Sequence, residues 1–464
     1  MPRAKAHPQE NESEETPSVE KKTLETRTPK GMRDIVGADF FAYQGFYERA
    51  AEVALYYGFQ PIETPILERE EVFGGIGEYT DIIEKEMYRL KTKGGDRLVL
   101  RPEGTAPILR AYLETGLQSQ PQPTLLYYYG PFFRHENPQR GRLRELRQFG
   151  LEVIGTEKSI ADTLVIKLLL LILGEVGLKN LTVELNTLGD KECHLVYRKA
   201  LTTYFRKFES KLSTHARELL KRNPIRLLDS KDPTVEPFKA DAPEAIDHLF
   251  GPAKQHFKEV LEYLESMEIP YKINSRLVRG LDYYSRTVFE IFEDTPAEVE
   301  GGEDKKMNVP ASPASGPAPL ALASGGRYDY LSRTLGSKKN IAAVGGAIGV
   351  DRVLEVARAN IPPPRIVKKP RAFFIQLGFD AKLKSIPIIE SLRQAKVPVK
   401  QSLSKDTLSV QLAMAERLGI PWVLILGQKE VIDNTIIIRN MDTRSQETVA
   451  IAGLSDYIKQ KIAR

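Results

Sequence analysis

The segment Arg279-Gly280-Leu281-Asp282-Tyr283-Tyr284 sets a permanent cation beside two phenols, just before the apolar run 287–292. A guanidinium stays charged and can hold a carboxylate or phosphate oxygen in a two-point fork, while each tyrosine offers an apolar wall with one polar tip. This chemistry suits a small zwitterionic substrate. Taken alone, however, the hexapeptide is explained more simply as a surface arginine followed by two half-buried core tyrosines.

A second segment, residues 132–144, concentrates positive charge at a Pro/Gly turn and runs on to Gln148 and Glu152. Its arginines are Arg134, Arg140, Arg142 and Arg144. The apolar stretch 125–133 enters the turn and the alternating stretch 149–154 leaves it, which predicts a hairpin. Such a hairpin can hold a polyphosphate at one end and an amine or imidazole at the other. A solvated basic turn would also fit.

A third segment, residues 343–354, places small residues ahead of a predicted helix whose first turn contains Arg352. Glycines allow a ligand to lie against the backbone, and an arginine there can cover a flat base or reach a terminal phosphate. Close packing of a strand on a helix is the commoner reason for such glycines.

Together these segments resemble the motifs of class II aminoacyl-tRNA synthetases. Residues 133–136 and the following basic loop resemble motif 2, residues 345–352 motif 3, and residues 58–65, ending at Pro65, motif 1. Three further segments resemble the set particular to the histidyl-tRNA synthetase family: 101–105, 279–284 and 323–329. The resemblance extends in the right order from residue 30 to the C-terminus.

The resemblance implies that a histidine carboxylate attacks the α-phosphorus of ATP, giving histidyl adenylate, and that histidine then passes to the terminal ribose hydroxyl of tRNA-His. Arg134 and Arg279 would act in catalysis, on the α-phosphate and the substrate carboxylate. Arg142 and Arg352 would hold the γ-phosphate end, with Mg²⁺ neutralising the triphosphate but no metal site built by the protein. Further residues are implied as follows: Glu136, Leu146 and Gly349 for ATP; Glu103, Gly104, Thr105, Gln148, Glu152, Tyr283 and Tyr284 for histidine; Gln139 and Arg140 for tRNA.

Within that histidine set, the resemblance gives Glu152 and Tyr284 to the two imidazole nitrogens, and Glu103, Thr105 and Gln148 to the ammonium. A carboxylate opposite a phenol supplies one partner for each ring nitrogen. An amino acid without a ring donor would leave Glu152 unpaired, which costs about 1–3 kcal/mol.

Two positions depart from the family pattern. Leu146 stands where motif 2 usually has a phenylalanine over the adenine, so we expect the base to rest between an aliphatic side chain and Arg352. Asn137 stands where many bacterial relatives carry an arginine in the loop that faces tRNA.

Two other functions remain open beside the ligase. A synthetase-like regulatory subunit would sense histidine without charging tRNA, and stress-kinase modules reuse the fold to bind RNA, but such relatives usually lose the reacting arginines or the C-terminal domain. A class II enzyme for threonine or proline would need a different pocket from Glu152 with Tyr283 and Tyr284.

The elements that must position these residues alternate between helical and strand patterns, and the resemblance implies an α+β fold with a class II antiparallel-sheet catalytic domain over residues 30–360. It begins with an amphipathic helix at 41–57 and a strand at 61–67, and the apolar run 168–173 is expected inside a buried helix. A helical insertion is expected at about 190–265, with helices at 191–221 and 242–267. A long loop rich in Pro, Ala, Ser and Gly is expected at about 295–320.

After a proline-rich basic linker at 361–370, strands and helices alternate over residues 371–464, which predicts a small α/β domain with a largely parallel sheet. We expect a hairpin-like pair around Asp433-Asn434 and a final helix. Composition leaves nucleotide binding and scaffolding both open here. The resemblance identifies this part as the anticodon-binding domain.

Composition limits the remaining choices. The 464-residue chain is 41% hydrophobic and 28% charged, with 67 basic and 62 acidic residues, so nucleic-acid contacts must come from local patches. The single Cys193 excludes internal disulfides and thiolate zinc clusters, which fits the cytoplasm. The apolar run 168–173 is too short to span a membrane. Residues 1–29 have the composition of a disordered tail. Motif 1 implies a homodimer.

Overall fold

The computed structural model describes residues 26–74, 82–138, 141–293 and 320–462. The chain divides into two compact units, Met1–Pro362 and Pro363–Arg464. Most of the expected N-terminal tail and of the expected loop at 295–320 lies outside the described residues, as do Gln139 and Arg140.

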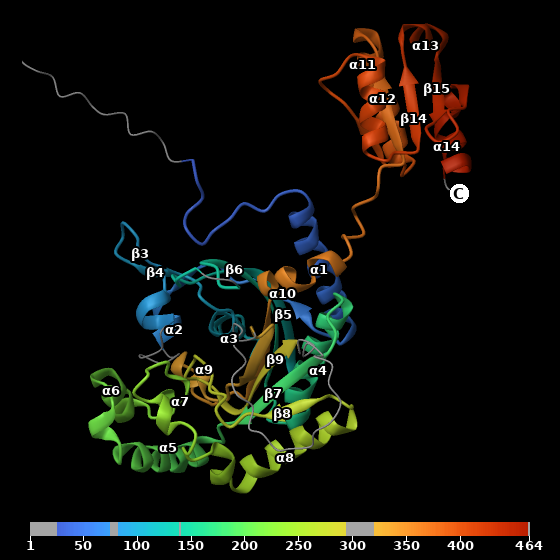
Figure 1. Cartoon of the computed structure of the whole chain (residues 1–464). Coiled ribbons are helices and arrows are strands. Elements are labelled where there is room, and N and C mark those ends of the chain that lie inside the picture. Colours follow the sequence, from blue (N-terminus) through green and yellow to red (C-terminus); the bar gives the residue numbers. More distant parts are fainter. Residues whose placement is uncertain (1–25, 75–81, 139–140, 294–319, 463–464) are drawn as a thin grey trace, which may run out of the picture. The chain divides into compact units, whose positions relative to one another are not determined.

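An eight-stranded sheet forms the centre of the first unit (Figure 1). Its strands, in spatial order, are β1 (Gln60–Pro61), β5 (Thr124–Phe133), β6 (Glu145–Ile154), β11 (Ala343–Gly349), β10 (Ala323–Arg327), β9 (Ser285–Glu293), β7 (Leu181–Thr187) and β8 (Tyr271–Ile273). The pairs β1/β5 and β7/β8 are parallel and all others are antiparallel. The predicted antiparallel α+β architecture is therefore confirmed.

One face of this sheet is apolar and packs into the core, whereas the other carries polar side chains, as strand β6 illustrates. Phe149, Leu151 and Val153 belong to the main apolar core. Because side chains alternate along a strand, the intervening Gln148 and Glu152 lie on the opposite face. The predicted hairpin is present: β5 and β6 pair from Thr124↔Ile154 to Phe133↔Glu145.

Helices cover the apolar face. They are α1 (Ala38–Tyr56), α4 (Ser159–Glu175), α8 (Gly251–Ser266) and α10 (Val350–Ala357), which ends in the 3₁₀ turn η7 (Arg358–Asn360). Helix α4 packs on β6, β10 and β11 on one side and on α1 and α8 on the other. This sandwiched position explains its apolar sequence and confirms the buried helix predicted around residues 168–173.

Smaller elements cover the other face. A three-stranded sheet contains β2 (Leu67–Arg69), β4 (Arg97–Leu100) and β3 (Arg89–Lys91). Around it lie α2 (Glu70–Phe73), the π-helical turn η2 (Ile82–Glu86), α3 (Thr105–Glu114), η3 (Leu117–Ser119) and α9 (Leu331–Thr334). Their apolar side chains form a second core with Tyr128, Tyr283 and Tyr328.

The predicted strand at 61–67 is wrong, since the chain is irregular between β1 and β2. Proline has no N–H to donate to a strand ladder, and this stretch contains Pro61 and Pro65. Thr64 instead accepts hydrogen bonds from Arg101, at 2.7 Å to its carbonyl and 3.1 Å to its hydroxyl.

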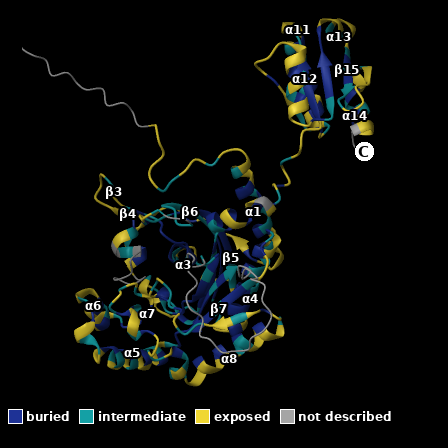
Figure 2. Ribbon diagram, in the orientation of Figure 1, coloured by how far each residue is buried: buried dark blue, intermediate teal, exposed yellow. Residues whose placement is uncertain are grey.

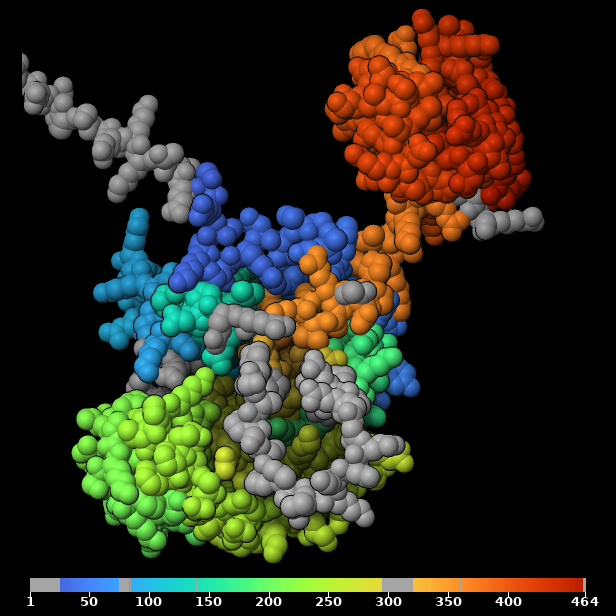
Figure 3. All heavy atoms as spheres, viewed as in Figure 1, coloured from blue at the N-terminus to red at the C-terminus, as the bar shows by residue number. Residues whose placement is uncertain are grey.

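The segment between β7 and β8 is helical. It contains α5 (Lys191–Arg206), η4 (Glu209–Lys211), α6 (Thr214–Arg222), α7 (Arg226–Asp229), η5 (Glu236–Phe238) and η6 (Ala245–His248), followed by α8. Residues such as Tyr197, Leu201 and Phe205 give it an apolar cluster of its own. In Figure 3 it gathers in one part of the unit, coloured green to yellow-green.

The long helices expected at 191–221 and 242–267 are wrong in their lengths. Ser213 accepts a hydrogen bond from the backbone N–H of Ala216 at 3.0 Å, so it caps a new helix instead of continuing α5. The second helix begins only at Gly251, with Pro252 in its first turn.

The second unit has a five-stranded sheet in the order β13 (Val399–Gln401), β12 (Ala372–Gln376), β14 (Trp422–Leu426), β15 (Thr435–Asn440) and β16 (Gln446–Ala450). Strands β13, β12 and β14 are parallel to one another, whereas the pairs β14/β15 and β15/β16 are antiparallel. Its helical elements are α11 (Phe379–Gln394), α12 (Leu408–Arg417), α13 (Gln428–Asp433), η8 (Ile451–Gly453) and α14 (Leu454–Ile462). The small α/β unit is as predicted, and Figure 2 shows its inner strands as mostly buried.

The hairpin predicted around Asp433-Asn434 is wrong in its position. Asn434 adopts a left-handed conformation, with φ of 52°, and ends helix α13. The hairpin follows instead, between β15 and β16. An asparagine that tolerates positive φ serves a helix end as readily as a turn, so the pattern alone did not distinguish the two.

No helix in the described part of the chain is both long and apolar enough to cross a membrane.

Candidate active site

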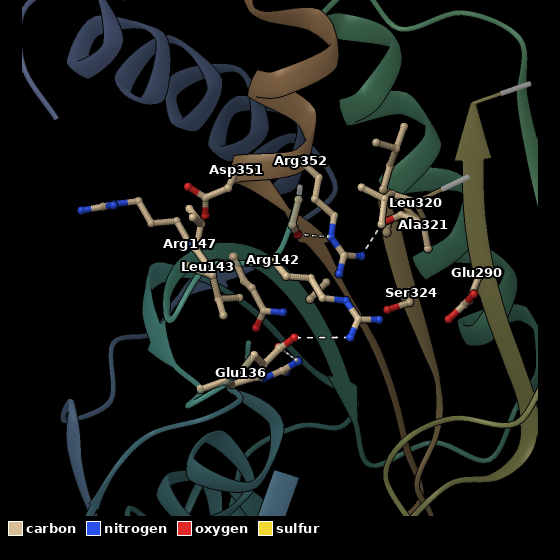
Figure 4. Close-up of a pocket in the computed structure, with 18 of the residues that line it drawn as sticks. Glu136, Arg142, Leu143, Arg147, Glu290, Leu320, Ala321, Ser324, Asp351 and Arg352 are labelled. Carbon is tan, nitrogen blue, oxygen red and sulfur yellow. Dashed lines mark hydrogen bonds and ion pairs between the residues drawn. The ribbon is translucent and has the colours of Figure 1, made fainter. Parts of the chain in front are cut away.

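A cavity of about 370 Å³ on the polar face of the central sheet gathers arginines from distant parts of the chain (Figure 4). Arg134 and Arg142 come from the connection between β5 and β6, Arg279 from the segment before β9, and Arg352 from the first turn of α10. The structure thus brings together the four arginines that the sequence singled out. We call this cavity the arginine pocket.

Backbone carbonyls hold two of these guanidinium groups in place. Arg134 Nε donates to the carbonyl of Pro102 at 2.9 Å. Arg352 donates to the carbonyls of Gly141 and Ala321, at 3.0 and 2.7 Å. A guanidinium has five N–H groups, so these contacts fix its direction and leave further donors for a ligand.

Arg279 is held by acidic and hydroxyl side chains. It forms an ion pair with Glu290 and donates to Ser324 Oγ at 2.8 Å, whereas its buried Nε has no hydrogen-bond partner among the described residues. A buried N–H without an acceptor is unfavourable, and a ligand oxygen would relieve it.

Like charges crowd one another in this pocket. Burial lowers the pKa of Arg352, and the positive charges of Arg134 and Arg142 lower it further. Glu136 provides partial compensation, with an oxygen 3.5 Å from Arg142 and another 4.0 Å from Arg134. An arrangement of this kind favours a multiply charged anion.

The remaining walls are partly apolar. Leu146 and Gly349, both expected at an ATP site, line the pocket with Leu143 and Phe292. In Figure 4, Leu143 lies near Arg142, while Arg147 extends away from the centre. Leu146 gives the pocket an aliphatic surface and Phe292 an aromatic one, so a flat ring has apolar surfaces to contact.

Glu290 and Phe292 were not predicted as site residues. Both lie on β9, where Phe289 and Ile291 face the main core and the alternate positions face the pocket. The sequence did contain a signal, because a glutamate inside an apolar strand is unusual.

Beside the arginine pocket lies a buried group that we call the carboxylate cluster: Glu103, Thr105, Glu152, Tyr128, Tyr283, Tyr284 and Tyr328. Glu103 accepts from the backbone N–H groups of Thr105 and Ala106 at 2.7 and 3.0 Å, and from the Tyr283 hydroxyl at 3.4 Å. Glu152, only 1% exposed, accepts from Thr105 Oγ1 at 2.8 Å and from the Tyr328 hydroxyl at 2.5 Å.

Neither carboxylate has an ion-pair partner within the described ranges. Burial raises the pKa of Glu103, and it raises the pKa of Glu152 to about 8. Burying a carboxyl without a cation is expensive. A ligand with positive charge or N–H donors would therefore stabilise the cluster.

Glycines make room for the cluster. A Cβ atom on Gly345 would lie 1.7 Å from Glu152 Oε2, and one on Gly150 would lie 2.2 Å from the Tyr128 ring. Likewise, a Cβ on Gly104, a predicted histidine-binding residue, would lie 2.6 Å from Tyr128. Gly345 of β11 therefore serves the site as well as the packing of the strand.

The two compartments adjoin but are distinct. Of the predicted histidine-binding residues, Gln148 lines the arginine pocket, whereas Glu103, Gly104, Thr105, Glu152, Tyr283 and Tyr284 do not. Tyr283 and Tyr284 also border another cavity, of about 190 Å³, next to α5. The two compartments interact electrostatically through Arg134, whose charge lowers the pKa of Glu103 against the effect of burial.

Tyr328 is a cluster member to which no role was assigned from the sequence. It was visible as part of the segment 323–329, but its contact with Glu152 joins residues 176 positions apart. Only folding reveals that pairing.

Comparison with known proteins shows which family the chain belongs to. The profile of the family described as histidyl-tRNA synthetase matches residues 31–353, and that of the anticodon binding domain matches residues 377–461. A histidine–tRNA ligase of Dehalococcoides mccartyi is 37% identical over 438 residues, covering 94% of this chain and 100% of the relative. The histidine–tRNA ligase of Caldicellulosiruptor bescii is 36% identical over 442 residues, covering 95% and 100%.

Solved structures show the same fold. The apo histidyl-tRNA synthetase of S. aureus superposes with a TM-score of 0.74 at 29% identity, covering 93% of this chain and 99% of the other. A Bacillus halodurans protein described as an ATP phosphoribosyltransferase regulatory subunit/histidyl-tRNA synthetase has a TM-score of 0.60 at 21% identity, covering 88% and 99%. That second likeness concerns the fold alone.

Proposed function

The chain belongs to the histidyl-tRNA synthetase family, and from this premise we infer how its two compartments join histidine to tRNA-His at the expense of ATP. The activity is that of a histidine–tRNA ligase, a class II aminoacyl-tRNA synthetase. The observation that carries the residue assignments is the adjacency of a pocket of four arginines and two buried carboxylates that form no ion pair with any described residue.

ATP occupies the arginine pocket in this proposal. Arg142 and Arg352 bind the γ-phosphate end, Arg134 binds the α-phosphate, and the adenine lies against Leu146, Gly349 and Arg352. Glu136 orients Arg134 and Arg142 through its contacts with both. The crowding of positive charge supports this assignment, since a triphosphate compensates it.

The family also uses Mg²⁺ with ATP, and the residues present fit that ion. No group of three or more His, Cys, Asp or Glu side chains that could hold a metal occurs in the described part of the chain. Mg²⁺ is commonly held by one or two carboxylates together with substrate phosphates, and the pocket contains Glu136 and Glu290. Either of them, each already paired with an arginine, would hold the ion together with phosphate oxygens, and the ion would neutralise phosphate charge when bound.

Histidine occupies the carboxylate cluster. Glu103, Thr105 and Gln148 bind its ammonium group. Glu152 and Tyr284 bind the two ring nitrogens, and Tyr283 and Gly104 border the bound histidine. Neither carboxylate has an ion-pair partner among the described residues, and Glu152 feels no neighbouring cation, which supports this assignment because the substrate brings positive charge and N–H donors.

In the reaction, a carboxylate oxygen of histidine forms a bond to the α-phosphorus as the bond to the bridging oxygen of the β-phosphate breaks, releasing pyrophosphate. Arg134 and Arg279 align the reacting carboxylate and phosphate and stabilise the charge on the phosphoryl oxygens. The terminal ribose hydroxyl of tRNA then attacks the histidyl carbonyl and AMP leaves. Neither step requires a covalent bond to the enzyme.

The C-terminal unit matches the anticodon-binding family and, in this proposal, binds the anticodon region of tRNA-His. Gln139 and Arg140 meet the 5′ end of that tRNA. The protein acts as a homodimer in the cytoplasm. Light scattering at micromolar concentration tests the dimer, and a measured mass equal to that of a single chain would contradict it.

A regulatory, non-charging subunit is the weaker alternative. The chain retains all four arginines in one cavity and also the anticodon-binding domain. A sensor that only bound histidine would need neither a triphosphate pocket nor that domain.

Exchange of labelled pyrophosphate into ATP tests this function. The wild-type protein should catalyse exchange only with histidine, and Arg279→Ala should reduce it by about 100-fold or more, as expected for loss of a charge aimed at the reacting phosphate. Arg276→Ala, an exposed arginine three positions earlier, should retain exchange. Exchange driven by another amino acid, or full activity of Arg279→Ala, would contradict the proposal.

A further inference from the structure

We propose that Tyr328 is a positioning residue that sets amino-acid specificity: with Thr105, it holds the Glu152 carboxylate as a pure acceptor that demands an N–H from the substrate ring. This inference rests on the proposed function, because it concerns how the same site distinguishes histidine from ring analogues.

The geometry leaves the carboxylate of Glu152 with one donor on each oxygen. Thr105 Oγ1 lies 2.8 Å from Oε1 and the Tyr328 hydroxyl 2.5 Å from Oε2. A carboxylate has about four acceptor sites, so two remain for a ligand. With both oxygens engaged, the carboxylate cannot rotate freely about its terminal bond.

Tyr328 is itself fixed from several directions. Its backbone N–H donates to the carbonyl of Ala343 at 2.8 Å, and its ring meets that of Tyr283 edge to face at 5.9 Å between centroids. The preceding residue, Arg327, is fully buried and pairs with Asp162 at 2.5 Å and Asp329 at 3.1 Å. This network anchors the end of β10, from which Tyr328 reaches Glu152.

The direction of hydrogen bonding follows from chemistry. Burial and the neighbouring Glu152 raise the pKa of Tyr328 well above its usual value, so its hydroxyl keeps its proton and donates it. The bonds from Tyr328 and Thr105 counteract the effect of burial on Glu152 and favour its ionised form. In the empty protein burial still holds the pKa of Glu152 high, and bound histidine, which brings positive charge and N–H donors, favours the ionised form further; an ionised carboxylate can only accept.

Loss of the Tyr328 hydroxyl should therefore change the kind of ligand that is accepted. Without this donor, the buried carboxyl keeps its proton to higher pH and can donate to a ring nitrogen that has no hydrogen. The other ionisable groups that face Glu152 are Glu103, whose charge raises the pKa of Glu152 further, and the phenols of Tyr128, Tyr283 and Tyr284. None of these supplies a cation to replace the lost bond.

The test compares histidine with 2-thiazolylalanine, whose ring has an acceptor nitrogen but no N–H, in pyrophosphate exchange by wild type and Tyr328→Phe. We expect the KM for histidine to rise about tenfold, the value for loss of one hydrogen bond to a charged group. The KM for ATP should not change, the preference for histidine over the analogue should fall by about tenfold or more, and the acidic limb of the pH profile should shift upward.

Tyr112→Phe is the matched control. Tyr112 is 2% exposed, belongs to the same apolar core and donates to Gln122 at 3.1 Å, away from Glu152. Tyr112→Phe should change the KM values for histidine and the analogue by the same factor. The inference would be overturned if Tyr328→Phe kept wild-type discrimination and pH dependence, or if it also affected both amino acids equally. A wild-type protein without histidine-dependent exchange would instead refute the proposed function.

Discussion

At the scale of single residues, the site depends on groups that are poorly compensated in the empty protein. Arg352 lies among like charges, and within the part of the chain that the structure describes, Arg279 Nε has no hydrogen-bond partner and Glu152 has no ion-pair partner. Each of these costs folding free energy, and each is relieved by the substrate that the proposal assigns to it. Affinity and instability of the empty site therefore have the same physical origin.

Arg352 should not tolerate lysine. Its two bonds to the carbonyls of Gly141 and Ala321 use the planar fork of the guanidinium, which an ammonium cannot reproduce. We expect Arg352→Lys to raise the KM for ATP about 10- to 100-fold, corresponding to roughly 1.4–2.8 kcal/mol, with a much smaller change in the KM for histidine.

Pyrophosphate exchange at varied ATP and histidine concentrations measures both constants. Arg358→Lys, at an exposed arginine in the turn that follows the same helix, is the control and should leave both KM values unchanged. Equal effects on the two substrates would contradict an assignment of Arg352 to ATP.

Glu152 should make the empty protein less stable as pH rises. Burial raises its pKa from 4.5 to about 8 in the folded state, so between these values the folded protein binds more protons than the unfolded chain. The stabilisation is complete below about pH 4.5 and is lost as pH rises through about 8. The pKa of Glu103 is also raised in the folded state, so Glu103 adds to this loss of stability with rising pH.

Urea unfolding without histidine, measured between pH 5.5 and 8.5, tests this expectation. The midpoint of wild type should fall with rising pH, and Glu152→Gln should weaken that dependence. Glu157→Gln, which changes an exposed residue just beyond the same strand, should behave like wild type. An identical slope in Glu152→Gln would show that Glu152 is ionised throughout.

At the scale of elements, the alternation of side chains across the central sheet separates stability from chemistry. On β6 and β9, every second residue packs into the main core, and the residues between them face the site. On β11 the site-facing positions are small, since Gly345 and Ala347 leave space for Glu152 and the arginine pocket. A shift of one residue in register would exchange the two faces.

Gly345→Ala should therefore damage the site more than the fold. The new Cβ would lie 1.7 Å from Glu152 Oε2 and 2.9 Å from the carbonyl of Leu151, so the carboxylate must move. We expect a loss of about 100-fold or more in kcat/KM for histidine, as for a misplaced substrate-orienting group. Overpacking should cost about 1–3 kcal/mol in unfolding free energy.

Gly174→Ala is the matched substitution, because a Cβ atom there meets nothing within 4 Å. It should keep full activity in exchange assays and an unchanged or slightly raised melting temperature. If Gly345→Ala bound histidine normally by calorimetry, the cluster would not be the histidine site.

At the scale of the whole molecule, the chain divides into two compact units, and the proposal assigns amino-acid activation to the first and recognition of the anticodon region to the second. The first contains both compartments of the site, and the second contains a groove of about 940 Å³ lined by several cations, including Lys368, Lys369, Lys396 and Lys459. A cationic groove suits a phosphate backbone. The two activities should therefore respond to different substitutions.

Reversing the charge of Lys459 on α14 tests that separation. Lys459→Glu should raise the KM for tRNA several-fold and reduce the slope of log affinity against log salt by about 1, the value for one phosphate contact. Pyrophosphate exchange should be unchanged. Lys179→Glu, an equal charge change at an exposed site in the first unit, should leave the tRNA constants as they are. If both variants changed the tRNA constants equally, the groove would contribute only through the net charge of the protein and not through a direct phosphate contact.

Much of this molecule could be predicted from its sequence. The β5–β6 hairpin, the buried helix α4 and the α/β character of the second unit follow from local patterns of polarity and charge, whereas the roles of the site residues were implied by their resemblance to family motifs. Such patterns reflect interactions between residues close together in the chain. They mispredicted elements where a local feature had two uses, as at Asn434, or where prolines interrupted the strand expected at 61–67.

Only the tertiary structure decided which groups meet. The pairing of Tyr328 with Glu152, the contact of Arg279 with Glu290 and the space that Gly345 leaves for a carboxylate depend on how separate strands align. Hydrogen bonds and close packing act over a few ångströms, so partners far apart in the chain become identifiable only after the sheet has set their register. The sequence by itself determined which chemical groups are available, and folding determined what each of them can hold.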